Sequence, residues 1–307
     1  MKNFFYKFFI LLLINNNVYG DNDSMKTITN ESIEKIYNEG ERLIPGESHD
    51  ISEVIRHKSS YSFFKQIIEA DILNNPSILK DKIKILDIGC GTGHGTFMLS
   101  GILGAEITAV DISEESIIYA KKNYAAKNIK YLVSDIESFI KSADIYDYIV
   151  SRHALEHVNN GLNTALKFKY NKRLMVNVPY NEPEGNVYHL VNWITEKDFE
   201  SYPNKEFFYE GLDGVTFKER FENNPPNSII CVSSAPMLTP INTLFNYPIS
   251  AWEPFFLEKL GLTSMNEITR LQLEISDLNS KLEEKNSLTS LILKKIRCLF
   301  KSNKHCA

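Results

Sequence analysis

The segment Leu86–His94, LDIGCGTGH, constrains the fold of this chain more than any other. The mostly apolar run Ile83–Leu86 indicates a buried β-strand, which then meets an acid, Asp87, and three alternating glycines. The glycines are Gly89, Gly91 and Gly93. A strand that passes through such a loop into a helix lets the backbone approach a ligand closely, and the helix N-terminus favours a negative group. The sequence therefore predicts a site for a small anionic or nucleoside ligand.

The spacing of the glycines excludes two common nucleotide-binding loops. A dinucleotide fingerprint, G-x-G-x-x-G, would need its third glycine at the position of His94. A phosphate-binding loop would need Gly-Lys-Ser or Gly-Lys-Thr, which is absent from this loop. The pattern that stands here is Asp-x-Gly-x-Gly-x-Gly, and it resembles the first motif of class I S-adenosylmethionine (SAM) methyltransferases.

Strand-like and helix-like segments alternate from Ile83 onward, which is typical of a mostly parallel sheet with helices on both faces. Seven segments have the composition of strands: Ile83–Ile88, Glu106–Val110, Ile129–Val133, Tyr146–Val150, Arg173–Val178, Glu206–Tyr209 and Ile229–Ser233. The last two are expected to pair as an antiparallel edge unit. Helices are expected over Gly95–Leu103, Ser113–Tyr124 and Val158–Tyr170, with Ser113 as an N-cap. The prediction is an α/β, Rossmann-like fold with a seven-stranded sheet.

In the SAM sites that this chain resembles, each strand end contributes a contact. The glycine loop would present backbone N–H groups to the methionine carboxylate, and Asp87 would reach the amino group through water. Asp111, about twenty residues beyond the loop, would accept hydrogen bonds from the ribose hydroxyls. Ile112 and Ile136 would enclose the adenine, and Asp135 would accept from its exocyclic amine. The resemblance thus implies SAM as the cofactor.

Segments on both sides of the loop resemble a narrower group, the bacterial class I methyltransferases found with glycosyltransferases in surface-polysaccharide and lipopolysaccharide biosynthesis. The matching segments are Gly40–Gly46, His57–Phe63, Ser151–Val158, Asn186–His189 and Trp193–Phe199. This resemblance implies methyl transfer to a hydroxyl or an amine of a sugar or glycan precursor. Two alternatives remain: a methyltransferase for a quinone, lipid or small metabolite, and a non-catalytic scaffold with the same fold.

His157 is the candidate catalytic residue, because a hydroxyl nucleophile gains from a base that titrates near neutral pH. Glu156 or His153 would orient it, and the alternative is that His157 only shapes the substrate pocket. Related methyltransferases that act on quinone precursors or RNA ends hold a divalent metal here with two acids and histidines. Glu156, His157 and His189 are present, while His153 stands where an acid is common. The metal requirement therefore stays unknown.

Composition narrows the partners and the compartment. The formal net charge of -5 gives no general attraction to nucleic acid. The four cysteines are scattered without C-x-x-C spacing, as in a reduced cytoplasmic protein: Cys90, Cys231, Cys298 and Cys306. Because SAM is a cytosolic metabolite, we expect a cytoplasmic protein. The expected acceptor is a small molecule or a glycan.

The chain divides into four segments by sequence character. Residues 1–24 resemble a secretory signal or an anchor, and the alternative is translation from Met25. Residues 25–260 form the expected methyltransferase domain. Residues 265–287 carry a short a/d seam, typical of a coiled coil for oligomerisation or of one helix packed on the domain. Residues 288–307 form a basic amphipathic tail, either peripheral to an anionic membrane or without a partner.

Overall fold

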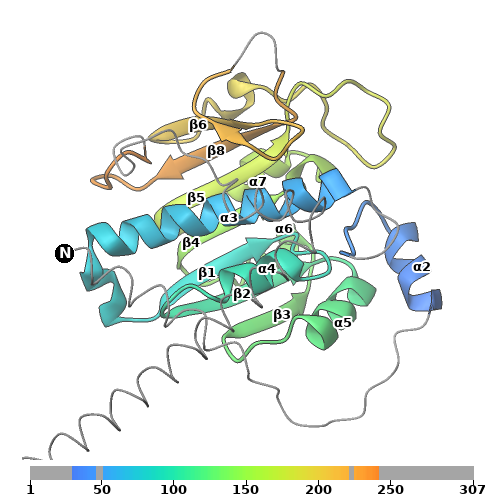
Figure 1. The fold of residues 1–307 in the computed structure, drawn as a ribbon, viewed down its shortest axis with the longest axis horizontal. Helices are drawn as coiled ribbons and strands as arrows, with labels where there is room; N and C mark the ends of the chain where they lie inside the picture. Colours follow the sequence, from blue (N-terminus) through green and yellow to red (C-terminus); the bar gives the residue numbers. More distant parts are fainter. Residues whose placement is uncertain (1–29, 46–50, 221–224, 242–307) are drawn as a thin grey trace, which may run out of the picture.

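The computed structural model describes residues 30–45, 51–220 and 225–241, and Figure 1 shows their arrangement. Within these ranges, eight strands form one sheet in the order β3-β2-β1-β4-β5-β8-β6-β7. The first five strands pair in parallel, whereas β8 runs antiparallel to both β5 and β6. The segments predicted as 1–24, 265–287 and 288–307 lie outside the described residues, as does the end of the predicted domain beyond residue 241.

All seven predicted strands are present. They are β1 (Ile83–Ile88), β2 (Ala105–Asp111), β3 (Ile129–Val133), β4 (Tyr146–Arg152), β5 (Tyr170–Pro179), β6 (Lys205–Glu210) and β8 (Ser228–Ser234). The predicted antiparallel pairing of the last two is confirmed. The predicted count of seven is wrong, because β7 (Thr216–Phe217) adds an eighth strand and takes the edge. A strand of two residues is too short to show a periodicity in sequence.

The helices differ more from prediction. The described helices are α2 (Asn30–Asn38), α3 (Ile51–Asn74), α4 (His94–Leu99), α5 (Glu114–Asn123), α6 (Ile136–Phe139) and α7 (Gly161–Ala165), with 3₁₀ turns η1 (Pro76–Lys80), η2 (Leu155–His157) and η3 (Glu196–Phe199). Ser113 caps α5 as predicted, accepting from the Ser116 N–H. The helix expected to reach Leu103 ends at Leu99, shortly before Gly101 and Gly104.

The helix predicted over Val158–Tyr170 is wrong in extent. Only Gly161–Ala165 is α-helical. Asn160 before it adopts the left-handed conformation (φ 55°), so a helix from Val158 cannot continue through it. At the other end, Tyr170 already belongs to β5, where it lies opposite Tyr146 of β4. Apolar residues in this stretch pack against the sheet from a turn rather than from a long helix.

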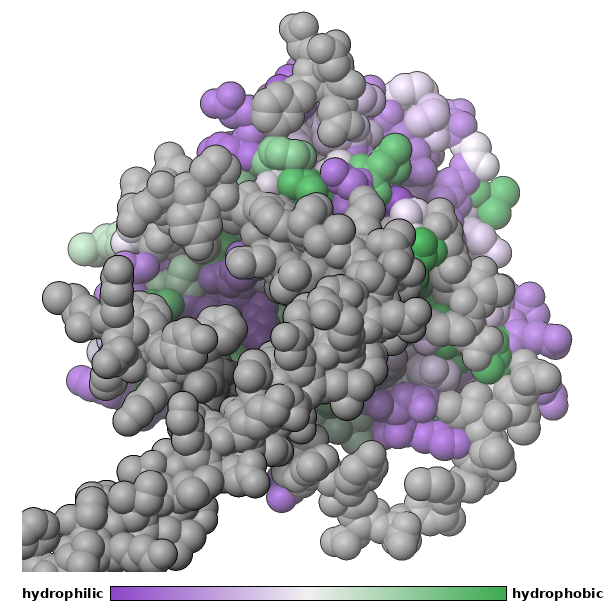
Figure 2. All heavy atoms as spheres, in the orientation of Figure 1, coloured by the Kyte–Doolittle hydropathy of each residue, from purple (hydrophilic) through white to green (hydrophobic). Residues whose placement is uncertain are grey.

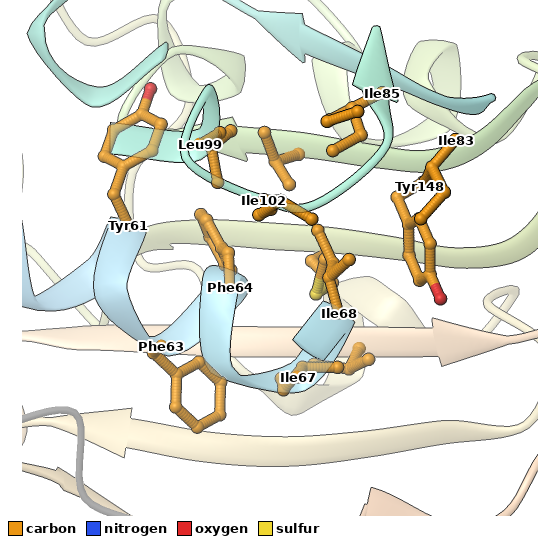
Figure 3. Packing of buried hydrophobic residues seen from close by; sticks show 14 of the residues in the cluster. Tyr61, Phe63, Phe64, Ile67, Ile68, Ile83, Ile85, Leu99, Ile102 and Tyr148 are labelled. Carbon is orange, nitrogen blue, oxygen red and sulfur yellow. The ribbon is translucent and has the colours of Figure 1, made fainter. Parts of the chain in front are cut away.

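The 24-residue helix α3 crosses one face of the sheet and was not predicted (Figure 1). Its apolar residues point in several directions: Tyr61 and Phe64 lie toward the side of Leu99, whereas Phe63 points away from them (Figure 3). The Phe63 ring packs on Phe208 of β6 with centroids 5.0 Å apart. Because α3 is apolar on more than one side, it lacks the single stripe that identifies a surface helix in sequence.

Side chains alternate between two hydrophobic cores, one on each face of the sheet. On β1, Ile83 and Ile85 pack with α3, while Leu86 and Ile88 pack on the opposite face with residues of η2 and η3. Period-two alternation of this kind is what a sheet covered on both sides requires. Hydrophilic residues dominate the visible described surface, with apolar residues in small groups (Figure 2). None of the helices in the described ranges combines the length and apolarity needed to span a membrane.

A buried ion pair fixes α3 to the centre of the sheet. The Arg173 guanidinium of β5 donates to both carboxylate oxygens of Asp71, at 2.8 and 2.7 Å. The Tyr148 hydroxyl donates to the same carboxylate at 3.2 Å. The side chains of Arg173 and Asp71 are 0% and 3% exposed, so each charge depends on the other for its solvation.

Replacing Asp71 by Ala is expected to lower the free energy of unfolding by about 3–5 kcal/mol, because it leaves a buried guanidinium without its carboxylate. The double variant Asp71→Leu/Arg173→Met removes both charges and should recover most of this loss. Lys65→Ala is the matched control, since it breaks the exposed pair with Glu69 and should cost less than about 1 kcal/mol. Urea denaturation of the three variants measures the differences, and equal losses in Asp71→Ala and Lys65→Ala would contradict the expectation.

Candidate functional site

A cavity of about 1170 Å³ opens where the carboxyl ends of the parallel strands meet. The strand order reverses between β1 and β4, and ligands of open α/β sheets bind at such a switch point. Residues after β1, β2 and β3 line one half of the cavity: Gly89, Gly91, Asp111, Ile112, Asp135 and Ile136. Residues of α3 and residues that follow β4 and β5 line the other half: Arg56, His57, Arg152, His153, His157 and His189.

The glycine loop lies against the cavity, but its N–H groups donate hydrogen bonds to other groups of the protein. The N–H groups of Gly89 and Cys90 donate to the carbonyl of Val110, and that of Gly91 donates to Asp111 Oδ2 at 2.8 Å. The expectation that the glycine N–H groups face a ligand carboxylate is therefore wrong for these positions. Gly89 has a φ of 72°, and a Cβ there would collide with Ala154. The glycine serves close packing and backbone shape.

Asp111 ends β2 at the cavity wall, as predicted. Its Oδ1 accepts from the Ser113 N–H at 2.9 Å and pairs with Arg42 Nη2 at 3.2 Å. Together with the Gly91 N–H, these donors hold the carboxylate in one orientation beside the loop. Arg42 belongs to the segment between α2 and α3. A second contact holds this segment, because Thr92 Oγ1 of the glycine loop donates to the carbonyl of Leu43 at 2.6 Å. The segment around Arg42 is thus fastened over this half of the cavity.

Ile112, Asp135 and Ile136 also line the cavity where they were predicted to. The Ile112 side chain is 66% exposed, which is unusual for a large apolar residue and leaves it free to cover a flat apolar ring. Asp135 is the N-cap of α6, and its Oδ1 accepts from the Ser138 N–H at 2.8 Å.

Asp87 and Gly93 lie beneath the cavity rather than on its wall. Asp87 is buried and accepts from Thr96 Oγ1 at 2.6 Å and from the Tyr61 hydroxyl at 3.1 Å. Burial raises the pKa of Asp87 to about 7, against the effect of these hydrogen bonds. Gly93 is the left-handed N-cap of α4, where a side chain would meet Ala120. Neither residue lines the wall on which the sequence placed a ligand contact, so we assign both to support of the loop.

His157 lies in η2 and lines the second half of the cavity. Its Nδ1 is 2.9 Å from the carbonyl oxygen of Tyr188. A carbonyl only accepts, so Nδ1 carries the proton and Nε2 is left with a free lone pair. Burial lowers the pKa of His157 below its ordinary value, which keeps the ring neutral at pH 7. The predicted orienting partners, Glu156 and His153, do not contact it; the Tyr188 backbone orients it.

The cluster suited to a metal differs from the predicted one. Ligand atoms of Glu41, His157 and His189 lie within 4.8 Å of one another, whereas Glu156 is not part of the group. Such a carboxylate and two imidazoles suit a borderline divalent cation. His189 already uses both ring nitrogens, Nε2 toward Glu41 at 3.0 Å and Nδ1 toward Glu182 at 2.5 Å. A cation would have to replace the Glu41–His189 hydrogen bond, so the network is complete without one.

Glu156 is fully buried, and neither of its carboxylate oxygens accepts a hydrogen bond from a described residue. Burial raises its pKa to about 8. His153, 3.9 Å away, adopts a φ of 45° and directs Nε2 toward Ser228 Oγ at 2.9 Å. Burial also lowers the pKa of His153 well below its ordinary value. Both groups are thus held largely uncharged, His153 on the cavity wall and Glu156 behind it.

Three basic residues of the cavity wall were not predicted as functional: Arg42, Arg56 and Arg152. Arg42 lies within a segment that was matched by resemblance without a role. Arg152 lies in another matched segment, two residues beyond the predicted strand Tyr146–Val150, and an ionisable residue near such a strand end is a recognisable signal. Arg56 stands on α3, the helix that has no visible periodicity, so no sequence signal points to it.

Comparisons with known proteins match the part of the chain that contributes Gly89, Gly91, Asp111, Ile112, Asp135 and Ile136 to the cavity. Residues 85–169 match the family model described as "Methyltransferase domain". The chain is 38% identical over 79 residues to malonyl-[acyl-carrier protein] O-methyltransferase of Bacillus anthracis, covering 25% of this chain and 29% of that protein. It is 44% identical over 80 residues to the ubiquinone biosynthesis O-methyltransferase of Coxiella burnetii, covering 24% and 32%. The chain thus spans about a third of the length of these curated relatives.

Among solved structures, the chain is similar to the plantazolicin methyltransferase BpumL in complex with a triazolic desmethylPZN analog and SAH (S-adenosylhomocysteine). The TM-score is 0.45 at 16% identity, over 67% of this chain and 90% of that one. The strand order described above is that of an α/β, Rossmann-like fold, as predicted. The family match covers β1 to the residue before β5, and so includes the glycine loop, Asp111, Asp135 and His157.

The burial of Glu156 predicts a pH-dependent stability. Its pKa is about 8 in the folded state against an ordinary value of 4.5, so the folded protein binds the proton more tightly and becomes less stable as pH rises between these values. Relative to Glu156→Gln, the wild type should lose at most about 1.4 kcal/mol per pH unit from roughly pH 5 to pH 8. Denaturant unfolding across this range measures the difference. Glu200→Gln, at an exposed position, is the control; parallel pH profiles for the wild type and Glu156→Gln would refute the expectation.

Proposed function

We propose that this protein is a SAM-dependent methyltransferase. The observation that carries the proposal is the set of Asp111, Ile112, Asp135 and Ile136 on one cavity wall, at two neighbouring strand ends beside a glycine loop. A carboxylate and an exposed isoleucine after β2, with a second pair after β3, suit a ribose and an adenine ring. The family match over residues 85–169 supports the same activity.

Bound SAM supplies a methyl group that is already activated as a sulfonium. The protein then has to align a nucleophile with that carbon and keep water away, and much of the rate comes from this positioning. The segment between α2 and α3 helps to keep water away, because contacts of Arg42 and of the Leu43 carbonyl hold it over the cofactor half of the cavity. His157 contributes a neutral imidazole whose Nδ1–H is tied to Tyr188 and whose Nε2 is able to accept a proton from a hydroxyl.

The acceptor in this proposal is a hydroxyl, or an amine, of a sugar or glycan precursor. The second half of the cavity supports it, since histidines, arginines, asparagines and glutamates line it and offer hydrogen bonds to a polar molecule. Both relatives are named as O-methyltransferases, which favours oxygen over nitrogen. A quinone or lipid acceptor would call for a more apolar wall, and a scaffold without catalysis gives no reason for a proton-accepting His157. SAM is made in the cytosol, so the proposal places the enzyme in the cytoplasm.

The Asp111→Ala variant tests the cofactor assignment. It should bind SAH at least about tenfold more weakly than the wild type, because hydrogen bonds to a charged group are worth about 1.5–3 kcal/mol. Isothermal titration calorimetry measures the affinity, and the melting temperature shows whether the variant is folded. Asp144→Ala removes an exposed acid near the opposite end of β4 and should leave SAH binding unchanged. Equal affinity in the wild type and Asp111→Ala would exclude the ribose contact.

The acceptor class is tested by transfer of labelled methyl groups from SAM into a fractionated cell extract, with Asp111→Ala as the blank. Label in nucleotide-sugar or polysaccharide fractions is the expected result. Label in a lipid or quinone fraction would keep the chemistry and replace the acceptor. No label above the blank would favour the scaffold.

A base role for His157 predicts both a rate and a pH profile. With the labelled acceptor fraction, His157→Asn should lower kcat by about 10²–10⁴-fold and leave SAH affinity unchanged. In the wild type, activity should rise with pH through a pKa below 6.5 and be constant above pH 7, because burial lowers the pKa of His157. His94→Asn, a histidine outside the cavity wall, is the control. A variant that keeps the wild-type rate would show that His157 only shapes the pocket.

A further inference from the structure

Arg152 stands out among the residues of the second cavity half. It is the last residue of β4, it lines the cavity, and its side chain is only 7% exposed. Its Nε donates to Ser60 Oγ at 3.4 Å. Its Nη2 donates no hydrogen bond to any described residue, and the ion pair of Nη2 with Glu53 is 3.7 Å long. A buried guanidinium that leaves a donor unused is costly, so the geometry indicates a missing acceptor.

The charges around Arg152 do not balance. Arg56 approaches the same carboxylate more closely, with Nη2 2.8 Å from Glu53 Oε2, so the two guanidiniums share one acid. The other ionisable groups whose pKa values respond to Arg152 are a tyrosine, two histidines and two further glutamates: Tyr61, His57, His153, Glu156 and Glu210. Burial lowers the pKa of both histidines well below the ordinary value and raises the pKa of Glu156 to about 8 and of Glu210 to about 7. Near neutral pH Glu156 is then mostly protonated and Glu210 about half ionised, so together with Glu53 they offset the two guanidiniums only in part.

The position of Arg152 separates it from the cofactor half. It pairs with Asn177 of β5 in the sheet register, and Asn177 in turn donates to Glu210 of β6 at 3.1 Å. Asp111 ends β2 and Asp135 follows β3, and both strands lie on the other side of β1. A group that reaches Arg152 therefore lies toward β5 and α3. In the proposed enzyme, this is where the acceptor has to sit.

We propose that the acceptor carries an anionic group, a carboxylate or a phosphate, that binds Arg152, with Arg56 as the second cation. This inference rests on the proposed function and specifies its acceptor. A guanidinium offers a planar fork of donors that matches the oxygens of either anion, and the free Nη2 supplies one of them. The anion would satisfy that donor and offset the second positive charge. Within a sugar or glycan precursor, the group is a uronic carboxylate or a sugar phosphate.

The test uses the full-length protein saturated with SAH, titrated with inorganic phosphate and with acetate at constant ionic strength and followed by NMR. We expect at least one anion to bind above a sodium chloride reference, and Arg152→Gln to weaken that binding at least tenfold. Arg152→Lys keeps the charge and should bind more tightly than Arg152→Gln. Arg56→Gln is a second variant that should weaken binding without altering a strand residue. Arg220→Gln, an exposed arginine outside the cavity, is the control.

The outcomes separate this inference from the proposed function. Phosphate-selective binding would indicate a sugar phosphate, and acetate-selective binding a carboxylate. Absence of anion binding in the wild type, or equal binding in the wild type, Arg152→Gln and Arg56→Gln, would overturn the inference. A parallel loss of SAH affinity in folded Arg152→Gln would also overturn it, because Arg152 would then hold the methionine carboxylate of the cofactor. Failure of the wild type to bind SAH would instead contradict the proposed function.

Discussion

The hydrogen bonds to the buried Asp87 carboxyl hold together the parts that form the cavity. Asp87 is the last but one residue of β1, Tyr61 donates to it from α3, and Thr96 donates to it from α4. One side chain thus sets the distance between the glycine loop, the helix that follows it and the helix that crosses the sheet. Burial raises the pKa of Asp87 to about 7, so keeping this group out of water has a cost in stability at higher pH. A buried carboxyl beneath the cavity therefore helps to fix the elements that form the cavity wall.

Several ionisable groups around the second half of the cavity are also buried with few hydrogen-bond partners. Glu156 and Glu210 are fully buried with raised pKa values, and the buried Arg152 keeps an unused donor. Natural cores seldom retain so many poorly satisfied polar groups, and such groups concentrate where function needs them. Arg173 provides the contrast, because its equally buried guanidinium is fully paired with Asp71. We interpret the fully paired Arg173 as structural, and Arg152, which lines the cavity with an unused donor, as part of the ligand site.

The parts of this protein that were predictable from sequence are those with local signals. The strands β1 and β3 were located to the residue, since buried parallel strands are short apolar runs bounded by turns. The positions of Asp111, Ile112, Asp135 and Ile136 on the cavity wall followed from strand ends. The helix α3 was not predictable, because it is apolar on several sides, and with it Arg56 was missed. Glu41 of the metal-suited cluster was also missed, since it joins His157 and His189 only through tertiary folding.

The helix α3 links the two halves of the cavity, which bears on how acceptor and cofactor depend on each other. Its first turns carry Glu53, Arg56 and His57 on the acceptor side, and Tyr61 one turn later is bonded to Asp87 under the cofactor loop. A helix buried this thoroughly moves as a rigid unit, so a shift at one end is transmitted to the other. An anion drawn to Arg56 and Arg152 would pull on the same element that supports the glycine loop. The binding of an acceptor anion and the position of the cofactor loop would then depend on each other, because both involve contacts of α3.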